Sequence, residues 1–288
     1  MSSVFGVGIA TVDIINSVND YPQEDSEIRA ISQRISRGGN VCNTLTVLSQ
    51  LEHHCYWCGV ISEESDSHYI LDDLKKNKID LSFVQSIHDG KVPTSYITLN
   101  QKNGSRSIVH YRDLPELSYL FFQSLHLPQC DWFHFEARAI DETIQMIKFV
   151  RSRRPSATIS VEIEKQREAL ERILGVADVY LFSKAYAVQS GFQSPEKFLM
   201  HQHAQSTNAD LVCSWGEKGA TAFLSNGELI HSKAFPPEKV IDTLGAGDTF
   251  NAGIIHSRLT GFDWQQGLEF ACQLAGKKCG QFGFQNLN

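Results

Sequence analysis

The sequence lacks the features that mark membrane, secreted and nucleic-acid-binding proteins. No stretch approaches the roughly 18 apolar residues that a membrane-spanning helix needs. The first ten residues carry no basic group, no small-residue cleavage site follows, and Asp13 interrupts the apolar run, so we expect no secretory signal. Lys and Arg nowhere form a run, and the net charge of −7 disfavours nucleic-acid and anionic-membrane partners. These absences favour a soluble, cytoplasmic protein.

Cysteine is present, but its spacing indicates neither a disulfide framework nor a typical metal site. The seven cysteines are an odd number, and the one C-x-x-C pair, Cys55 and Cys58, has no second pair or histidine nearby. Zinc needs four ligands, which usually come from two such clusters. We therefore interpret the cysteines as buried free thiols in a reducing compartment. A redox or zinc role for Cys55 and Cys58 remains a distant alternative.

Short apolar runs alternate with helical patterns along most of the 288 residues, and no internal repeat or low-complexity linker interrupts them. Such alternation predicts an α/β fold, in which a mostly parallel central sheet is flanked by helices. The expected strands are Val4–Ile9, Cys55–Ile61, Asp131–Phe135, Thr158–Ile163, Val179–Phe182 and Leu211–Ser214. The expected helices are Asn40–Leu51, Tyr69–Lys76, Asp141–Arg151, Arg167–Leu174, Pro195–His203, Thr249–Leu259 and Gln265–Gly280.

Two segments depart from this rhythm. Glu27–Ile35 and Pro93–Arg112 alternate polar and apolar residues, and the second contains the turn Asn103-Gly104. Asn-Gly between alternating residues is a strong hairpin signal. We therefore predict a small antiparallel β lid formed by residues 11–37 and 92–113. The α/β core then comprises residues 1–10, 38–91 and 114–288.

A glycine-rich segment near the C-terminus carries the clearest chemical signal. A strand is expected to end at Val240. The chain then continues through Gly245 and Gly247 into a helix that is expected to begin near Asp248. Glycines let the backbone approach a ligand, and the free N–H groups of a first helical turn bind anions. The helix dipole is expected to keep Asp248 ionised. An ionised carboxylate beside a phosphate cradle suits phosphoryl transfer, because it can accept the proton of the attacking hydroxyl.

On these residues alone, an ordinary Asp-capped helix behind a glycine turn is an equal alternative. Other phosphate-binding motifs fit worse. The chain has no G-x-x-x-x-G-K-[ST] sequence, and the segment Gly245–Phe250 lacks the third glycine of a dinucleotide fingerprint.

The motif Asp242-Thr-Leu-Gly-Ala-Gly-Asp248 resembles the C-terminal signature of the ribokinase-like (PfkB) sugar kinases. Gly38-Gly39-Asn40-x-x-Asn43 and Trp215-Gly-Glu-Lys-Gly-Ala220 resemble two further family features, in the expected order. Over nearly its whole length the chain is similar to the branch that phosphorylates ketohexoses, the hepatic-type fructokinases. The most similar stretches are Tyr21–Arg29, Ser160–Lys165 and Ala275–Gly280.

The resemblance implies an ATP- and Mg²⁺-dependent enzyme that phosphorylates a small sugar, with the 1-hydroxyl of fructose as the acceptor. It also implies that a potassium ion can stimulate the enzyme. It also implies a homodimer whose lids clasp. Asp248 would be the general base, Gly245, Ala246 and Gly247 the anion hole, and Arg106 a contact of the transferred phosphate. The implied sugar-binding residues are Asp13, Gly39, Asn40, Asn43 and, from the partner chain, Asp25. The implied nucleotide-binding residues are Glu217, Gly219, Cys272, Ala275 and Cys279.

Each assignment has a simpler alternative. Asp13 interrupts an apolar strand, where a strand-end carboxylate needs water or a partner. Asn40 could be the N-cap of its helix, although Asn40 and Asn43 lie one turn apart and could face one ligand. Arg106 could be an ordinary exposed hairpin cation. Asp25 could be a solvated turn residue. Cys272 and Cys279 lie seven residues apart, on one face of a helix, which also fits a buried helix stripe.

The chain departs from the wider family at two places. Ser183-Lys-Ala-Tyr186 stands where many members have Asn-x-x-Glu, and Ile61–His68 lacks the usual Gly-x-Asp-x-x-Gly. We therefore assign no metal ligand. Two other functions remain as alternatives. One is a kinase for ribose, another fructose position or a nucleoside, since a few pocket side chains decide the acceptor. The other is a non-catalytic sugar or nucleotide sensor, which would have no need of Asp248.

Overall fold

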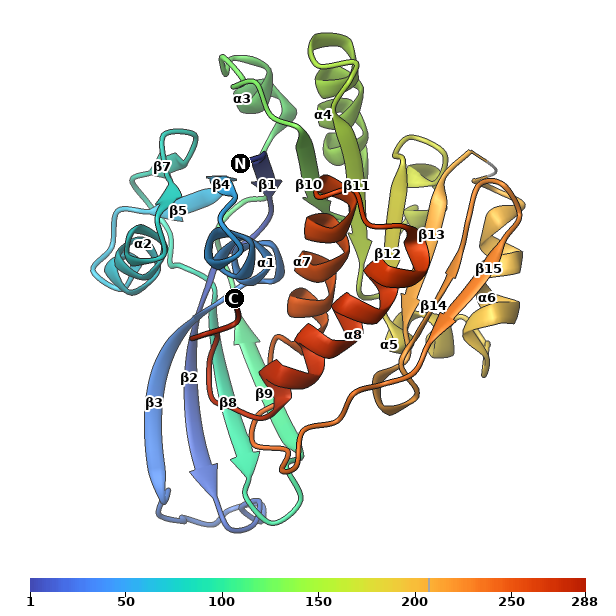
Figure 1. Ribbon diagram of the computed structural model, residues 1–288. Helices are drawn as coiled ribbons and strands as arrows, with labels where there is room; N and C mark the ends of the chain where they lie inside the picture. Colours follow the sequence, from blue (N-terminus) through green and yellow to red (C-terminus); the bar gives the residue numbers. More distant parts are fainter. Residues whose placement is uncertain (207) are drawn as a thin grey trace.

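The computed structural model describes residues 1–206 and 208–288, and its centre is a nine-stranded sheet (Figure 1). Seven neighbouring strands, β6, β4, β1, β10, β11, β12 and β13, pair in parallel, and β14 and β15 extend the sheet in antiparallel fashion. The spatial order is β15 (Leu229–Ser232), β14 (Ala220–Phe223), β13 (Asp210–Ser214), β12 (Val179–Phe182), β11 (Thr158–Ile163), β10 (Trp132–Glu136), β1 (Ser3–Val7), β4 (His54–Cys58) and β6 (Ile79–Asp80). The predicted α/β fold is confirmed. Its central strands β10, β11 and β12 are mostly apolar because both of their faces are buried.

Helices cover both faces of this sheet. On the near side in Figure 1 lie α1 (Asn40–Gln50), α7 (Ala246–Leu259) and α8 (Trp264–Cys279), which pack on one another. Behind the sheet lie α4 (Ile140–Arg153) and α6 (Pro195–His203). The shorter helices are α2 (Ser67–Lys76), α3 (Tyr119–Gln123) and α5 (Lys184–Gln189). Among the described residues, no helix is long and apolar enough to cross a membrane.

A second, four-stranded sheet projects from the core at the lower left of Figure 1. Its order is β3 (Ser32–Gly38), β2 (Thr11–Val18), β8 (Thr94–Asn100) and β9 (Arg106–Tyr111). The outer pairings are antiparallel and the central one, β2 with β8, is parallel. The predicted hairpin is confirmed: Gly104 has φ +71°, and Asn103 Oδ1 accepts a hydrogen bond from the N–H of Ser105. We call this sheet the lid.

Some predicted elements are wrong or displaced. The expected helix Arg167–Leu174 is only a 3-10 turn, Leu170–Ile173, because Ala169 before it adopts the left-handed region. The expected strand Glu27–Ile35 forms instead over Ser32–Gly38. The edge hairpin of β14 and β15 was not expected, although Asn226-Gly227 between its strands is a hairpin signal. The small pair of β5 (Val60–Ser62) and β7 (Gln85–Ile87) was missed too.

All seven cysteines are free, and six of them are buried. Cys55 and Cys58 stand three positions apart on β4, so their side chains point to opposite faces of the sheet. Burial raises the pKa of both thiols. Within residues 1–206 and 208–288 no three His, Cys, Asp or Glu side chains are grouped to hold a metal ion. The structure thus agrees with buried free thiols for six of the seven cysteines. It places no further His, Cys, Asp or Glu of the described residues where a zinc site with Cys55 and Cys58 would need them.

Candidate active site

A cleft of about 870 Å³ lies between the lid and the carboxyl ends of the core strands. Ligands of open α/β sheets bind at this edge. Residues that end or follow successive strands line its core wall, namely Glu136 at the end of β10, Glu164 after β11, Ser183 after β12 and Ser214 at the end of β13. Eight of the predicted site residues line it as well: Asp13, Gly39, Asn40, Asn43, Arg106, Gly245, Gly247 and Asp248.

The glycine-rich loop ends at the first turn of α7. Gly245 is the N-cap with φ +76°, and the ring of Phe284 lies 2.2 Å from where a Cβ at this position would stand. Any side chain here would therefore strain the backbone and collide with the ring. Space is open around Gly247, so a ligand can approach the N–H groups of the first turn, where the helix dipole favours an anion.

Asp248 lies in the first turn of α7 and is 7% exposed. Asn43 Nδ2 donates a hydrogen bond to its Oδ2 at 2.6 Å. Burial raises the pKa of Asp248 to about 7, against the lowering effect of the Asn43 hydrogen bond, and the Glu164 and Glu136 carboxylates raise it further. At this carboxylate, burial therefore opposes the effect that is expected of the helix dipole.

The start of α1 forms the neighbouring wall. A Cβ on Gly39, whose φ is +104°, would come within 2.1 Å of the Ile9 carbonyl oxygen, so α1 begins tightly against the chain that follows β1. Asn40 Nδ2 lies 3.2 Å from Glu162 Oε1 and 3.1 Å from Glu164 Oε2. Its side chain does not cap the helix, so the N-cap alternative was wrong. Asn40 and Asn43 both line the cleft.

The lid supplies Asp13 and Arg106. Asp13 lies within β2, so its expected place at a strand end was wrong. Its Oδ1 accepts a hydrogen bond from Thr11 Oγ1 at 2.8 Å, and burial raises its pKa. Arg106, at the start of β9, donates from Nη1 to Thr243 Oγ1 at 3.3 Å. This hydrogen bond joins the lid to the glycine-rich loop.

A second lid contact reaches the same loop. Arg34 Nη2 lies 3.0 Å from Asp242 Oδ2. From the other side, the fully buried Lys278 of α8 donates from Nζ to the Asp242 carbonyl oxygen at 2.9 Å and lies 3.5 Å from Oδ2. Asp242 is thus held by one cation of the lid and one of the core.

The remaining predicted residues lie outside this cleft. Ala246 is the first residue of α7, between two glycines that line the cleft. Glu217 and Gly219 belong to the turn around Gly216–Lys218, just beyond Ser214 at the cleft wall. Asp25 is exposed in the loop before β3 and has φ +57°. Cys272 and Ala275 lie along α8, and Cys279 is its last residue.

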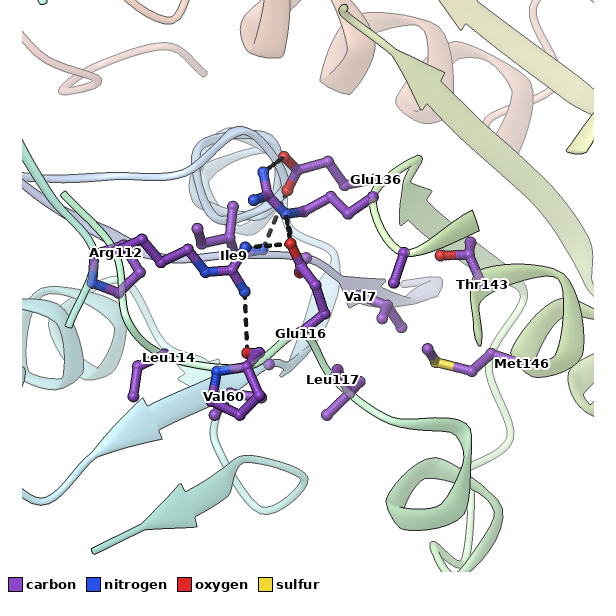
Figure 2. Close-up of a pocket in the computed structure, with 16 residues that line it drawn as sticks. Val7, Ile9, Val60, Arg112, Leu114, Glu116, Leu117, Glu136, Thr143 and Met146 are labelled. Carbon is purple, nitrogen blue, oxygen red and sulfur yellow. Dashed lines mark hydrogen bonds and ion pairs between the residues drawn. The ribbon is translucent and has the colours of Figure 1, made fainter. Parts of the chain in front are cut away.

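Sequence reasoning gave no role to several charged residues that line the cleft: Arg37, His110, Glu136, Arg138, Glu162, Glu164, Lys165 and Arg167. Glu136 accepts a hydrogen bond from the N–H of Ile9 and pairs with Arg138, which also binds Glu116. Figure 2 shows Glu136 close to Ile9 and Glu116. The small cavity in that view encloses about 30 Å³, room for about one water molecule. The sequence signal that could have found them is the acidic residues at the ends of neighbouring strands. To use this signal, one must know which strands are neighbours in the sheet.

The sequence matches the pfkB family of carbohydrate kinases over residues 1–288, and the chain belongs to this family. It is therefore a carbohydrate kinase. It is 40% identical to ketohexokinase of Mus musculus over 98% of this chain and 97% of the mouse protein. It is 23% identical to the ATP-dependent ribose-1-phosphate kinase of Halopiger xanaduensis, over 98% and 94% of the two chains. The structure of Arabidopsis thaliana ribokinase, complexed with ribose and ATP, superimposes with a TM-score of 0.79 at 19% identity and covers 98% of this chain and 94% of its own.

Proposed function

We propose that this kinase transfers the terminal phosphoryl group of ATP to a ketohexose, with the 1-hydroxyl of fructose as the preferred acceptor. The observation that carries the proposal is the place of Asp248. It is buried in the first turn of α7, directly behind the glycine-rich loop and inside the cleft, and Asn43 donates to it. The choice of a ketose is supported by the 40% identity to the mouse ketohexokinase.

The proposed chemistry needs mainly placement and charge stabilisation. The ionised Asp248 accepts the proton of the attacking sugar hydroxyl at one of its carboxylate oxygens. The backbone N–H groups of Gly245, Ala246 and Gly247 hold the negative charge that develops on the phosphoryl oxygens. Arg106 reaches the same loop from the lid and adds a positive charge there.

The sugar is proposed to lie between the lid and α1. Asp13 offers a partly buried carboxylate from β2, and Gly39, Asn40 and Asn43 face it from α1. One N–H of each asparagine amide already binds a carboxylate, so the sugar would compete for or extend these bonds. Closely placed oxygen acceptors and amide donors suit the adjacent hydroxyls of a sugar.

The nucleotide is proposed to extend from the glycine-rich loop past Ser214, towards Glu217, Gly219 and the α8 residues Cys272, Ala275 and Cys279. Mg²⁺ enters as part of the nucleotide substrate, because this ion keeps several waters and needs only one or two protein carboxylates. Glu162 fits that role: it lines the cleft, and its Oε2 is buried without a hydrogen-bond partner. The support for a stimulating potassium ion is the family resemblance alone, and turnover in KCl against NaCl tests it.

The lid is proposed to clasp a second copy of the chain. Its outer face carries a row of apolar side chains, one from each strand, at paired positions: Ile35, Ile14, Tyr96 and Val109. Three of them are 42%, 45% and 69% exposed, namely Ile35, Tyr96 and Val109. A contiguous exposed apolar row is typical of an association surface. Asp25 lies in the adjoining loop, from which it would reach the partner's sugar. Sedimentation of the purified chain measures its oligomeric state.

One assay tests the proposed reaction. ATP consumption is measured with fructose, ribose, ribose 1-phosphate, fructose phosphates and adenosine, and the position of the new phosphate is read by ³¹P NMR. The proposal expects the highest kcat/KM with fructose and a 1-phosphate product. A higher kcat/KM with another acceptor would overturn the ketohexose assignment, and binding without turnover would indicate a sensor.

A further inference from the structure

A chain of hydrogen bonds leads from Asp248 along the cleft wall to Arg37. Asp248 Oδ2 accepts from Asn43 Nδ2, and Asn43 Oδ1 accepts from Arg37 Nη1, each at 2.6 Å. Arg37 also donates from Nη2 to Thr46 Oγ1 at 2.9 Å and from Nε to Asp73 Oδ2 at 2.6 Å. Only 2% of the Arg37 side chain is exposed. Three acceptors therefore fix the position of the Arg37 guanidinium, near the C-terminal end of β3.

The chain has a direction, because a guanidinium can only donate hydrogen bonds. The oxygen of the Asn43 amide must face Arg37, and its NH₂ group must then face Asp248. If the amide were reversed, its oxygen would face the carboxylate oxygen, and neither could donate when Asp248 is ionised. Arg37 thus determines that Asn43 presents a donor, which stabilises the ionised carboxylate.

We propose that Arg37 is a positioning residue for phosphoryl transfer, which locks the Asn43 amide in this orientation and so keeps Asp248 ready to accept a proton. The inference rests on the proposed function of Asp248 as the base. Arg37 itself is not required to touch the sugar or the nucleotide.

The other charges around Asp248 make this support necessary. Glu136 from β10 and Glu164 just after β11 disfavour its ionisation, and Arg37 from β3 is a cation that favours it. The Asp248 carboxylate in turn raises the pKa of Glu162 on β11. On α1, the Cys42 thiol has a raised pKa and stays neutral. Loss of Arg37 therefore acts twice in the same direction: an attracting charge disappears, and Asn43 is free to turn.

The test compares Arg37→Met, Arg37→Lys and Asp73→Asn with a control, Arg151→Met. Arg151 also forms an ion pair with an aspartate, Asp178 at 2.7 Å, but it lies on α4 away from the cleft. Turnover with saturating ATP and fructose is measured from pH 6 to 9. In parallel, the Asp248 carboxyl is titrated by ¹³C NMR without substrates, and its signal is identified by its absence in Asp248→Asn.

For Arg37→Met we expect the acid limb of turnover and the carboxyl titration to move up by about one pH unit, which is roughly a fivefold loss at pH 7, nearly tenfold at pH 6, and recovers by pH 9. Lysine can donate to Asn43 but cannot hold all three acceptors, so Arg37→Lys should fall between wild type and Arg37→Met. Asp73→Asn should shift the limb less than Arg37→Met, and Arg151→Met should leave it in place.

Equal loss of turnover at every pH, or an unshifted carboxyl titration in Arg37→Met, would show a merely structural role and overturn the inference. If circular dichroism shows that Arg37→Met does not fold, the other two variants decide: unshifted titrations in both overturn it. If the wild-type protein phosphorylates no sugar, the proposed function fails. The NMR titration would still decide whether Arg37 controls the ionisation of Asp248.

Discussion

The pKa of Asp248, raised to about 7, makes the pH dependence of this kinase a direct test of its site. A general base acts only when it is deprotonated. About half of the free enzyme is then competent at pH 7 and about a tenth at pH 6, and below that each further unit of acidity removes roughly a factor of ten. We therefore expect kcat/KM for the sugar to rise about tenfold per pH unit up to a midpoint near 7, and to level off above it.

Two substitutions should move this midpoint in opposite directions. Glu164→Gln removes a carboxylate that raises the pKa of Asp248, so the midpoint should fall. Asn43→Ala removes the hydrogen bond that lowers it, so the midpoint should rise. The matched control is Glu168→Gln, which removes a carboxylate from an exposed residue nearby that does not line the cleft.

The assay follows ADP release with a coupled enzyme system in constant-ionic-strength buffers from pH 5.5 to 9, with the sugar below its KM. The coupling enzymes must be shown to be in excess at each pH. If wild type has no acid limb between pH 6 and 8, burial does not control the ionisation of Asp248 as argued. If both variants shift the midpoint in the same direction, the assigned electrostatic roles are wrong.

Three further results are expected. Asp248→Asn should lower turnover by roughly 10²–10⁴-fold and leave nucleotide affinity unchanged. The Tm of this variant at pH 8 should be no lower than that of wild type, since the carboxylate that resists ionisation is gone. More than a tenth of wild-type turnover would refute the role of Asp248 as the general base. Asp13→Ala should cost about 1.5–3 kcal/mol in kcat/KM for the sugar, whereas an equal loss of ATP affinity, measured by calorimetry, would place Asp13 at the nucleotide. Subunit exchange between inactive Asp25→Ala and Asp248→Asn proteins should restore up to about one quarter of wild-type activity, because half of the heterodimer sites carry neither change; no recovery despite verified exchange would place Asp25 in its own chain's site.

The sequence could predict the parts of the site that depend on local pattern. Gly245, Gly247 and Asp248 are adjacent in the chain, and a glycine turn before a helix has the same geometry in many proteins. The Asn103-Gly104 turn likewise predicted the hairpin that brings Arg106 over the cleft. In each case the backbone preference of a few neighbouring residues was sufficient.

The rest depended on contacts between distant segments. The Arg37–Asn43–Asp248 chain includes a hydrogen bond between residues 205 positions apart, Asn43 and Asp248, and no local pattern marks it. The raised pKa of Asp248 likewise depends on its burial and on the Glu136 and Glu164 carboxylates, which lie at the end of β10 and just after β11. The expected helix Arg167–Leu174 failed locally, at the left-handed Ala169, which helical periodicity does not reveal.

The pairing of Asp242 with both Arg34 of the lid and Lys278 of the core has a consequence for turnover. A partly exposed ion pair such as Arg34–Asp242 contributes only about 0–1 kcal/mol. When Arg34 withdraws, Lys278 still neutralises Asp242 from the core side, so no unpaired charge is left buried beneath the glycine-rich loop. Breaking this contact between the lid and the loop therefore costs little free energy and is reversible. A sugar and its phosphorylated product could exchange through that opening while the anion-binding loop stays in its working shape.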